Sequence, residues 1–151
     1  MRKCKWQDKP INGKVIPAKV FKAICNIIFQ SAKKGEKIEY GEITDIISKQ
    51  FPDVKINNYP DMGYILGEIN DQVAEKTKTS EENPTSIYPS SIVINKDTKK
   101  PGDGFWGVSS GDNPPSKFKD KSEDGQKEAL KKYRENVFDT SKWDCKCEET
   151  S

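Results

Sequence analysis

The residues of this 151-residue chain that could do chemistry are few, and histidine is missing altogether. The chain therefore lacks the commonest general base, the commonest zinc ligand and the usual partner of a serine or cysteine nucleophile. Ser90 and Ser91 begin an apolar segment, but a serine hydroxyl without a neighbouring base is a poor nucleophile near neutral pH. The sequence thus predicts a protein that is not an enzyme, with no catalytic residue and no cofactor.

The four cysteines lie at the two ends of the chain and in the first predicted helix. If the ends met, the thiolates of Cys4, Cys145 and Cys147 could hold zinc together with Asp144, but a Cys-x-Cys pair without a second pair is a weak metal motif. The chain has no apolar run long enough to span a membrane, and its first residues lack the apolar stretch of a signal peptide. We therefore expect a cytoplasmic protein without a metal, with free thiols and with Cys25 packed in the core.

Apolar periodicity predicts an α+β fold of about four helices with a small antiparallel hairpin. Helices are expected from Pro17 to Lys34, from Gly41 to Phe51, from about Pro60 onward and from Glu123 to Phe138. Strands are expected over Ser91–Asn95 and Phe105–Val108, joined by a turn over Lys96–Gly104. Short helices followed by a hairpin are typical of a winged helix-turn-helix.

The length fits one domain, which we place at residues 15–138. Residues 1–14 are polar and basic and are predicted to form an arm or an edge extension, and residues 139–151 are predicted to form a polar tail. Lysine outnumbers arginine 24 to 2 and isoleucine outnumbers leucine 15 to 2, a skew that we interpret as AT-rich coding in a bacterium or phage.

The order of several motifs suggests a family. The segments are Lys33-Lys34-Gly35-Glu36-Lys37-Ile38-Glu39-Tyr40-Gly41-Glu42-Ile43, then Met62-Gly63-Tyr64-Ile65-Leu66-Gly67-Glu68-Ile69-Asn70, then Tyr88-Pro89-Ser90-Ser91-Ile92-Val93-Ile94-Asn95, then Gln126-Lys127-Glu128-Ala129-Leu130. Over residues 18–138 this order resembles the DNA-binding domain of the methylguanine-DNA alkyltransferases and alkyltransferase-like proteins. The resemblance implies a winged-helix DNA-binding fold, a recognition helix near residues 62–70 and an active-site strand near residues 88–95.

The departures from the family pattern bear on function. Where the family has its alkyl-accepting cysteine and its histidine, this chain has Ser90 and Ser91, and suicide alkyl transfer requires a thiolate. The arginine that fills the gap left by a flipped base is matched by Pro60, Asp61 or Tyr64, of which only Tyr64 could act as a stacking wedge. Tyr40 matches a tyrosine that lines the family's base pocket, although closing a core with its hydroxyl at the surface is the more ordinary role of such a tyrosine.

Charge is distributed unevenly along the chain. Residues 1–40 carry a formal net charge of +7 and residues 41–90 one of −5, while residues 91–151 are neutral. Carboxylates on the third predicted helix oppose binding to phosphates, whereas Lys96, Lys99 and Lys100 in the predicted wing could contact them or serve only solubility.

Two classes of function remain open. The first is a non-enzymatic alkyltransferase-like domain that weakly binds nucleic acid, including modified DNA, through the wing and the first helix. Its candidate contacts are Tyr40, Tyr64, Ser90, Lys96, Lys99 and Lys100. The second is a protein-interaction module of a bacterial or phage accessory factor, with the acidic third helix and the hairpin as its surface. An enzyme with a pocket near Tyr40 and Ser90 ranks third, because no base or metal cluster accompanies these residues.

Overall fold

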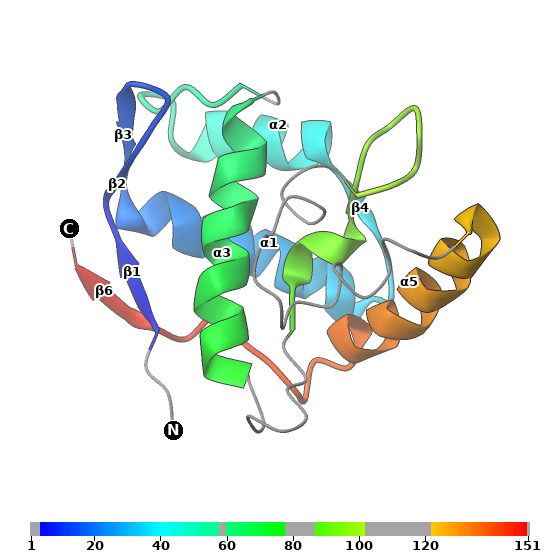
Figure 1. Ribbon diagram of the computed structural model, residues 1–151. Helices are drawn as coiled ribbons and strands as arrows, with labels where there is room; N and C mark the ends of the chain where they lie inside the picture. The colour runs from blue at the N-terminus through cyan, green and yellow to red at the C-terminus, as the bar shows by residue number, and fades with distance from the viewer. Residues whose placement is uncertain (1–3, 58–59, 78–86, 102–121, 151) are drawn as a thin grey trace.

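The computed structural model describes residues 4–57, 60–77, 87–101 and 122–150, which form an α+β fold (Figure 1). The helices are α1 (Ala18–Lys33), α2 (Tyr40–Gln50), α3 (Asp61–Thr77) and α5 (Glu123–Phe138), with a 3₁₀ turn η1 (Pro89–Ile92). The strands are β1 (Lys5–Gln7), β2 (Lys9–Ile11), β3 (Lys14–Ile16), β4 (Ile38–Glu39), β5 (Val93–Ile94) and β6 (Glu148–Thr150). The predicted class and the four predicted helices are confirmed.

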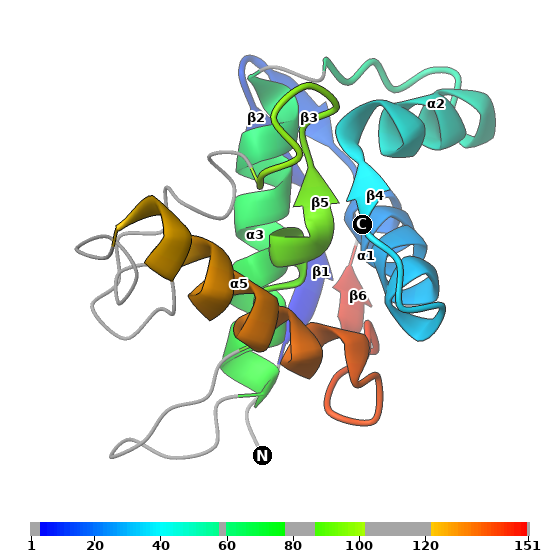
Figure 2. The ribbon, with the colours of Figure 1, turned by 90° about the vertical axis from the view of Figure 1, so that its right-hand side faces the viewer.

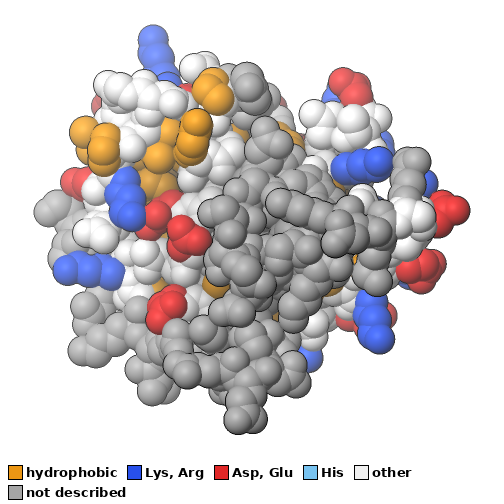
Figure 3. Space-filling model, in the orientation of Figure 1, with side chains coloured by type: hydrophobic (Ala, Val, Ile, Leu, Met, Phe, Trp, Pro, Cys, Tyr) orange, Lys and Arg blue, Asp and Glu red, His pale blue; other side chains and the backbone are white. Residues whose placement is uncertain are grey.

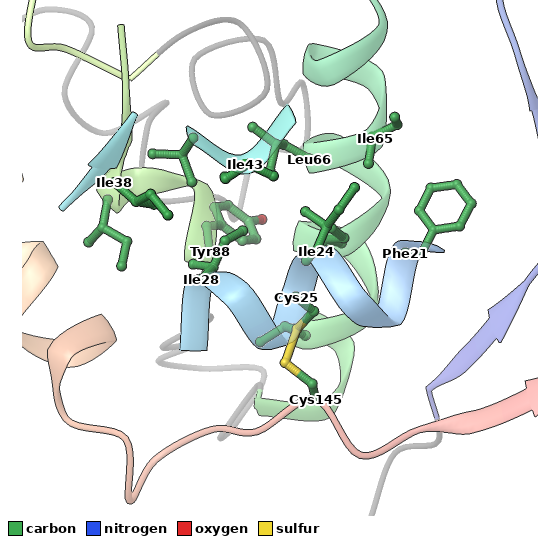
Figure 4. Packing of buried hydrophobic residues seen from close by; sticks show 14 of the residues in the cluster. Phe21, Ile24, Cys25, Ile28, Ile38, Ile43, Ile65, Leu66, Tyr88 and Cys145 are labelled. Atoms are coloured by element: carbon green, nitrogen blue, oxygen red, sulfur yellow. A yellow bond between two sulfur atoms is a disulfide. The ribbon is translucent and has the colours of Figure 1, made fainter. Parts of the chain in front are cut away.

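Helix α1 is the centre of the core because its apolar residues recur at three- and four-residue spacings. Figure 4 shows Ile24 and Ile28 of α1 beside Leu66 of α3, Ile43 of α2 and Tyr88, the residue before η1. Specific hydrogen bonds cap both ends of α1. The Asp8 carboxylate accepts a hydrogen bond from the Ala18 N–H at 2.8 Å, and Gly35, with φ +68°, closes the last turn.

The strands form three separate two-stranded pairings. The antiparallel pair is β2 with β3, whose tip residues Asn12 and Gly13 have positive φ values of 49° and 83°, as a two-residue hairpin turn requires. This hairpin is not the one predicted from the sequence. Ser91 and Ile92 belong to η1, not to a strand, and β5 pairs with β4 in parallel.

The predicted wing is described only as far as Pro101, which forms an antiparallel bridge with Ile94. Its second strand, Phe105–Val108, lies outside the described residues. The winged-helix arrangement of the fold therefore stays a prediction.

Parts of the predicted N-terminal segment and of the predicted polar tail are packed into the fold. Strands β1 and β6 pair in parallel (Figure 1), and the side chain of Trp6 is 1% exposed with its Nε1 donating to the Cys145 carbonyl at 2.9 Å. Trp143 is also buried and donates from Nε1 to the Val137 carbonyl at 2.7 Å. Burial of two tryptophans makes both ends part of the core.

The expectation of free thiols is wrong, because all four cysteines are paired. Cys4 is bonded to Cys147 and Cys25 to Cys145, which ties β1 to the C-terminal segment and that segment to α1 (Figure 4). The sequence could not indicate this pairing, because it depends on the two ends meeting beside α1. Among the described residues, no helix is both long and apolar enough to cross a membrane.

Candidate functional site: a lysine turn above a buried serine cluster

The pairing of β4 with β5 positions the first group of candidate residues. Ile38 lies opposite Val93 and Glu39 opposite Ile94, so the turn after β5 lies beside the start of α2 (Figure 2). Tyr40, the first residue of α2, is half-buried there. The structure thus brings Tyr40 and the turn of residues 95–100, which we call the lysine turn, to one end of the molecule.

The lysine turn is closed by its own hydrogen bonds. The Asn95 N–H donates to the Lys100 carbonyl at 2.9 Å, and the Asn95 side-chain oxygen accepts from the N–H groups of Asp97 at 2.8 Å and Thr98 at 3.2 Å. Such an Asx-type contact fixes a turn without further packing. Lys99 has a φ of 59° within it. The backbone that carries the lysines therefore has a defined shape.

The three lysine side chains of this turn are all exposed to solvent: Lys96, Lys99 and Lys100. The Lys99 ammonium lies 3.4 Å from a carboxylate oxygen of Glu39. A solvent-exposed pair of this kind contributes little stability, so it holds Lys99 only loosely. With Asp97 also in the turn, the loop carries a formal net charge of +2.

Ser90 does not lie with these lysines at the surface. It is 1% exposed, its hydroxyl accepts from the Asn70 Nδ2 at 2.7 Å, and its N–H donates to the Asn70 Oδ1 at 3.1 Å. Asn70 belongs to α3, so this amide joins α3 to η1. Because the buried hydroxyl and the backbone N–H of Ser90 are both hydrogen-bonded to Asn70, Ser90 has a structural role.

Ser91 and Arg134 complete the buried cluster from the side of α5. The Arg134 Nε donates to the Ser91 carbonyl at 2.7 Å, while the Ser91 Oγ and the Arg134 Nη2 are buried without a hydrogen-bond partner. Burial lowers the pKa of Arg134. Sequence reasoning missed Arg134, although its position as one of only two arginines in the chain was an available signal.

Tyr133 links α5 to the same region. Its hydroxyl accepts a hydrogen bond from the Tyr88 N–H at 2.7 Å, and burial raises its pKa far above the range of physiological titration. The phenol is therefore neutral and acts as a fixed acceptor. The described residues of the cluster join α3, η1 and α5 by hydrogen bonds, and Ser90, Ser91, Tyr133 and Arg134 include no carboxylate or imidazole that could act as a base.

Tyr64 lies apart from the lysine turn, on the outward face of α3. Its side chain is 60% exposed. The same face carries Asp71, Glu75 and Gly67, and a Cβ atom added at Gly67 would have no atom from outside its own helix within 4 Å. Burial and the neighbouring Glu68 raise the pKa of Asp71. The carboxylates on this face oppose phosphate, as the sequence predicted for this helix.

The β2–β3 hairpin neutralises the other edge of α3. Lys14 pairs with Asp61 at 2.6 Å and Lys9 with Glu68 at 2.8 Å. Two of the carboxylates that seemed available from the sequence are thus occupied within the fold.

A zinc site at the joined ends is excluded, because its thiols are used in disulfides. Within the described ranges no cluster of potential metal ligands is found. Comparison of the chain with models of known families, with curated proteins and with solved structures returns no match.

Proposed function

We propose that this chain is a non-enzymatic binding domain, related in plan to the alkyltransferase-like proteins, that binds nucleic acid weakly by its phosphates. The observation that supports this proposal is the lysine turn, in which three exposed ammonium groups stand on a hydrogen-bonded loop beside Tyr40. Ammonium groups on a fixed loop neutralise phosphates without reading sequence.

The proposed contact uses the turn and not the outward face of α3. Asp71 and Glu75 on that face would repel a phosphate backbone, and Tyr64 alone among its exposed side chains could stack on a base. Ser90, the match to the family's alkyl-accepting residue, is buried and bonded to Asn70. We therefore expect binding that does not distinguish a methylated guanine from an unmodified one.

The test is fluorescence anisotropy of a short labelled duplex, with and without a methylated guanine. The triple variant K96E/K99E/K100E should lose binding, because each lysine then repels a phosphate that it attracted. The matched control K49E/K55E/K127E changes three exposed lysines on other elements by the same charge. If both triple variants bind equally well, the lysine turn is not the contact surface.

A second candidate function rests on an exposed apolar patch on the hairpin and α3. Val15 is 63% and Tyr64 60% exposed, and Pro10, which pairs with Val15 across the hairpin, is exposed as well. Figure 3 shows apolar side chains gathered over this part of the molecule. An apolar patch beside Asp71 and Glu75 suits a protein partner with an apolar centre and basic flanks.

This second candidate has its own test. Cross-linked complexes formed by the wild type should disappear in V15S/Y64S and persist in K96E/K99E/K100E, because only the first variant removes the apolar patch. The reverse pattern would favour the lysine turn.

The cytoplasmic location predicted from the sequence stays a prediction, and the two disulfides weigh against it. Disulfides persist mainly in oxidising compartments. We propose that the chain acts in such a compartment. Thiol alkylation in freshly lysed cells, followed by mass measurement, tests this point: four alkylated cysteines would restore the cytoplasmic assignment.

A further inference from the structure

A pocket of about 440 Å³ lies at the opposite end of α3 from its contact with the β2–β3 hairpin. Its walls come from one face of α1, from the last turn of α3 and from the C-terminal segment 140–146. None of the residues of the lysine turn lines it. The volume falls within the range of small-molecule sites.

The lining of this pocket is strongly basic. Among the described lining residues the charged groups are Lys22, Lys76, Lys142, Lys146 and one carboxylate, that of Asp144, a formal net charge of +3. The Lys142 ammonium also donates to the Asn136 side-chain oxygen at 2.9 Å and lies 4.0 Å from the Asp139 carboxylate. Burial would raise the pKa of Asp144, but hydrogen bonds from Lys76 and the Lys146 N–H outweigh it and the pKa is lowered. Asp144 is therefore ionised at neutral pH and paired with Lys76, so these two charges cancel, and the remaining formal positive charge of the described lining belongs to Lys22, Lys142 and Lys146.

The same pocket offers an aromatic wall. Phe29 meets Trp143 edge to face, with ring centroids 5.0 Å apart and planes at 80°. Phe29 is half-buried, and both rings line the pocket. The Trp143 Nε1 is already used by the Val137 carbonyl. Trp143 is only 4% exposed, so the half-buried Phe29, backed by Trp143, supplies the apolar surface suited to a planar organic group.

Two disulfides hold in place the C-terminal segment that forms one wall of the pocket. Cys145, which lines the pocket, is bonded to Cys25 of α1 (Figure 4), and Cys147 is bonded to Cys4. The Cys25–Cys145 bond fixes this segment against α1, and the Cys4–Cys147 bond fixes it to the start of β1, before any ligand arrives. A preformed site loses less conformational freedom on binding than a flexible one.

We propose that this pocket binds a small aromatic phosphomonoester, a molecule of nucleoside monophosphate size. Its phosphate would meet the lysines of the C-terminal segment, and its ring would lie against Phe29. This site is independent of the lysine turn, and the proposal does not rest on nucleic-acid binding.

The test is an NMR titration of the full, disulfide-bonded chain with AMP and, separately, with inorganic phosphate. AMP should produce saturable shifts in the amides of residues 76–77 and 140–146. Inorganic phosphate should bind about tenfold more weakly, because it lacks the ring. The variant K142E/K146E should weaken AMP binding at least about tenfold. The matched variant K49E/K55E, on exposed lysines outside the pocket, should leave AMP binding unchanged.

Several results would overturn the proposal. They are the absence of AMP shifts at millimolar concentration, shifts confined to residues 95–100, equal binding of AMP and inorganic phosphate, or equal weakening in the two double variants. A thermal melt of K142E/K146E separates loss of binding from loss of folding. If that variant is unfolded, K142Q/K146Q, which removes charge without reversing it, takes its place with the same expected direction.

Discussion

Asn70 is the single residue on which the buried polar cluster most depends. Its amide satisfies both the hydroxyl and the N–H of Ser90, and both residues are almost completely buried. Replacing Asn70 by alanine leaves those two groups without partners, and each unsatisfied buried group costs about 1–3 kcal/mol.

We therefore predict that N70A lowers the free energy of unfolding by roughly 2–4 kcal/mol in urea titrations. The control N26A removes an exposed asparagine from α1 and should change it by less than about 0.5 kcal/mol. Equal stability of N70A and N26A would mean that the Asn70–Ser90 link is not formed.

Asp61 gives the fold a pH dependence. Burial would raise its pKa, but hydrogen bonds from Lys14, Asn57 and Asn12 outweigh burial and the pKa is lowered. A carboxylate with a lowered pKa stabilises the fold above its unfolded pKa, near 3.9, and loses that contribution as pH falls through the folded value.

The wild type should therefore exceed D61N in stability at pH 6, and the difference should shrink as pH falls from about 4 towards 2. Urea unfolding at several pH values measures this. A difference that stays constant over the whole range would contradict the assigned ionisation of Asp61.

At the scale of elements, helices were predictable and pairings between distant segments were not. The stripe of Val20, Phe21, Ile24 and Ile28 predicted α1 because helical periodicity is local. The β2–β3 hairpin was missed, although Asn12-Gly13 between alternating residues is a known hairpin signal.

The candidate site was predictable only in part, for the same reason. The exposed lysines of residues 96–100 follow from their place in a polar turn. Their position beside Tyr40 depends on the parallel pairing of β4 with β5, which joins residues 55 positions apart in the sequence. The burial of Ser90 depends likewise on Asn70 of another helix.

The disulfides are the element-scale feature with the largest expected effect on stability. Cys25 and Cys145 are 120 residues apart and Cys4 and Cys147 143 apart. A crosslink over a long loop stabilises by roughly 2–5 kcal/mol, mainly by restricting the unfolded chain. Reduction with dithiothreitol should lower the urea midpoint of the wild type accordingly.

The control for this prediction is the variant C4A/C25A/C145A/C147A, whose urea midpoint dithiothreitol should leave unchanged. Between the two pairs, C25A/C145A should cost more than C4A/C147A, because Cys25 and Cys145 are both core residues and alanine leaves a cavity. A wild type that is insensitive to reductant would contradict the paired state.

For the molecule as a whole, charge is arranged by region. Lys9 and Lys14 of the hairpin form ion pairs with carboxylates of α3. The outward face of α3 is acidic, and the lysine turn is basic. A chain with a net charge of only +2 thus presents surfaces of opposite character. Nucleic acid would meet the turn, and a basic protein would meet α3.

The proposed function is tested most directly by the salt dependence of duplex binding. Three lysines on three phosphates give a slope of about −2.7 in log affinity against log salt, so affinity should fall roughly 40-fold between about 50 and 200 mM salt. Anisotropy titrations of a methylated and an unmethylated duplex should show this fall equally. A flat response to salt, or no binding at the lower concentration, would contradict phosphate-directed binding by the lysine turn.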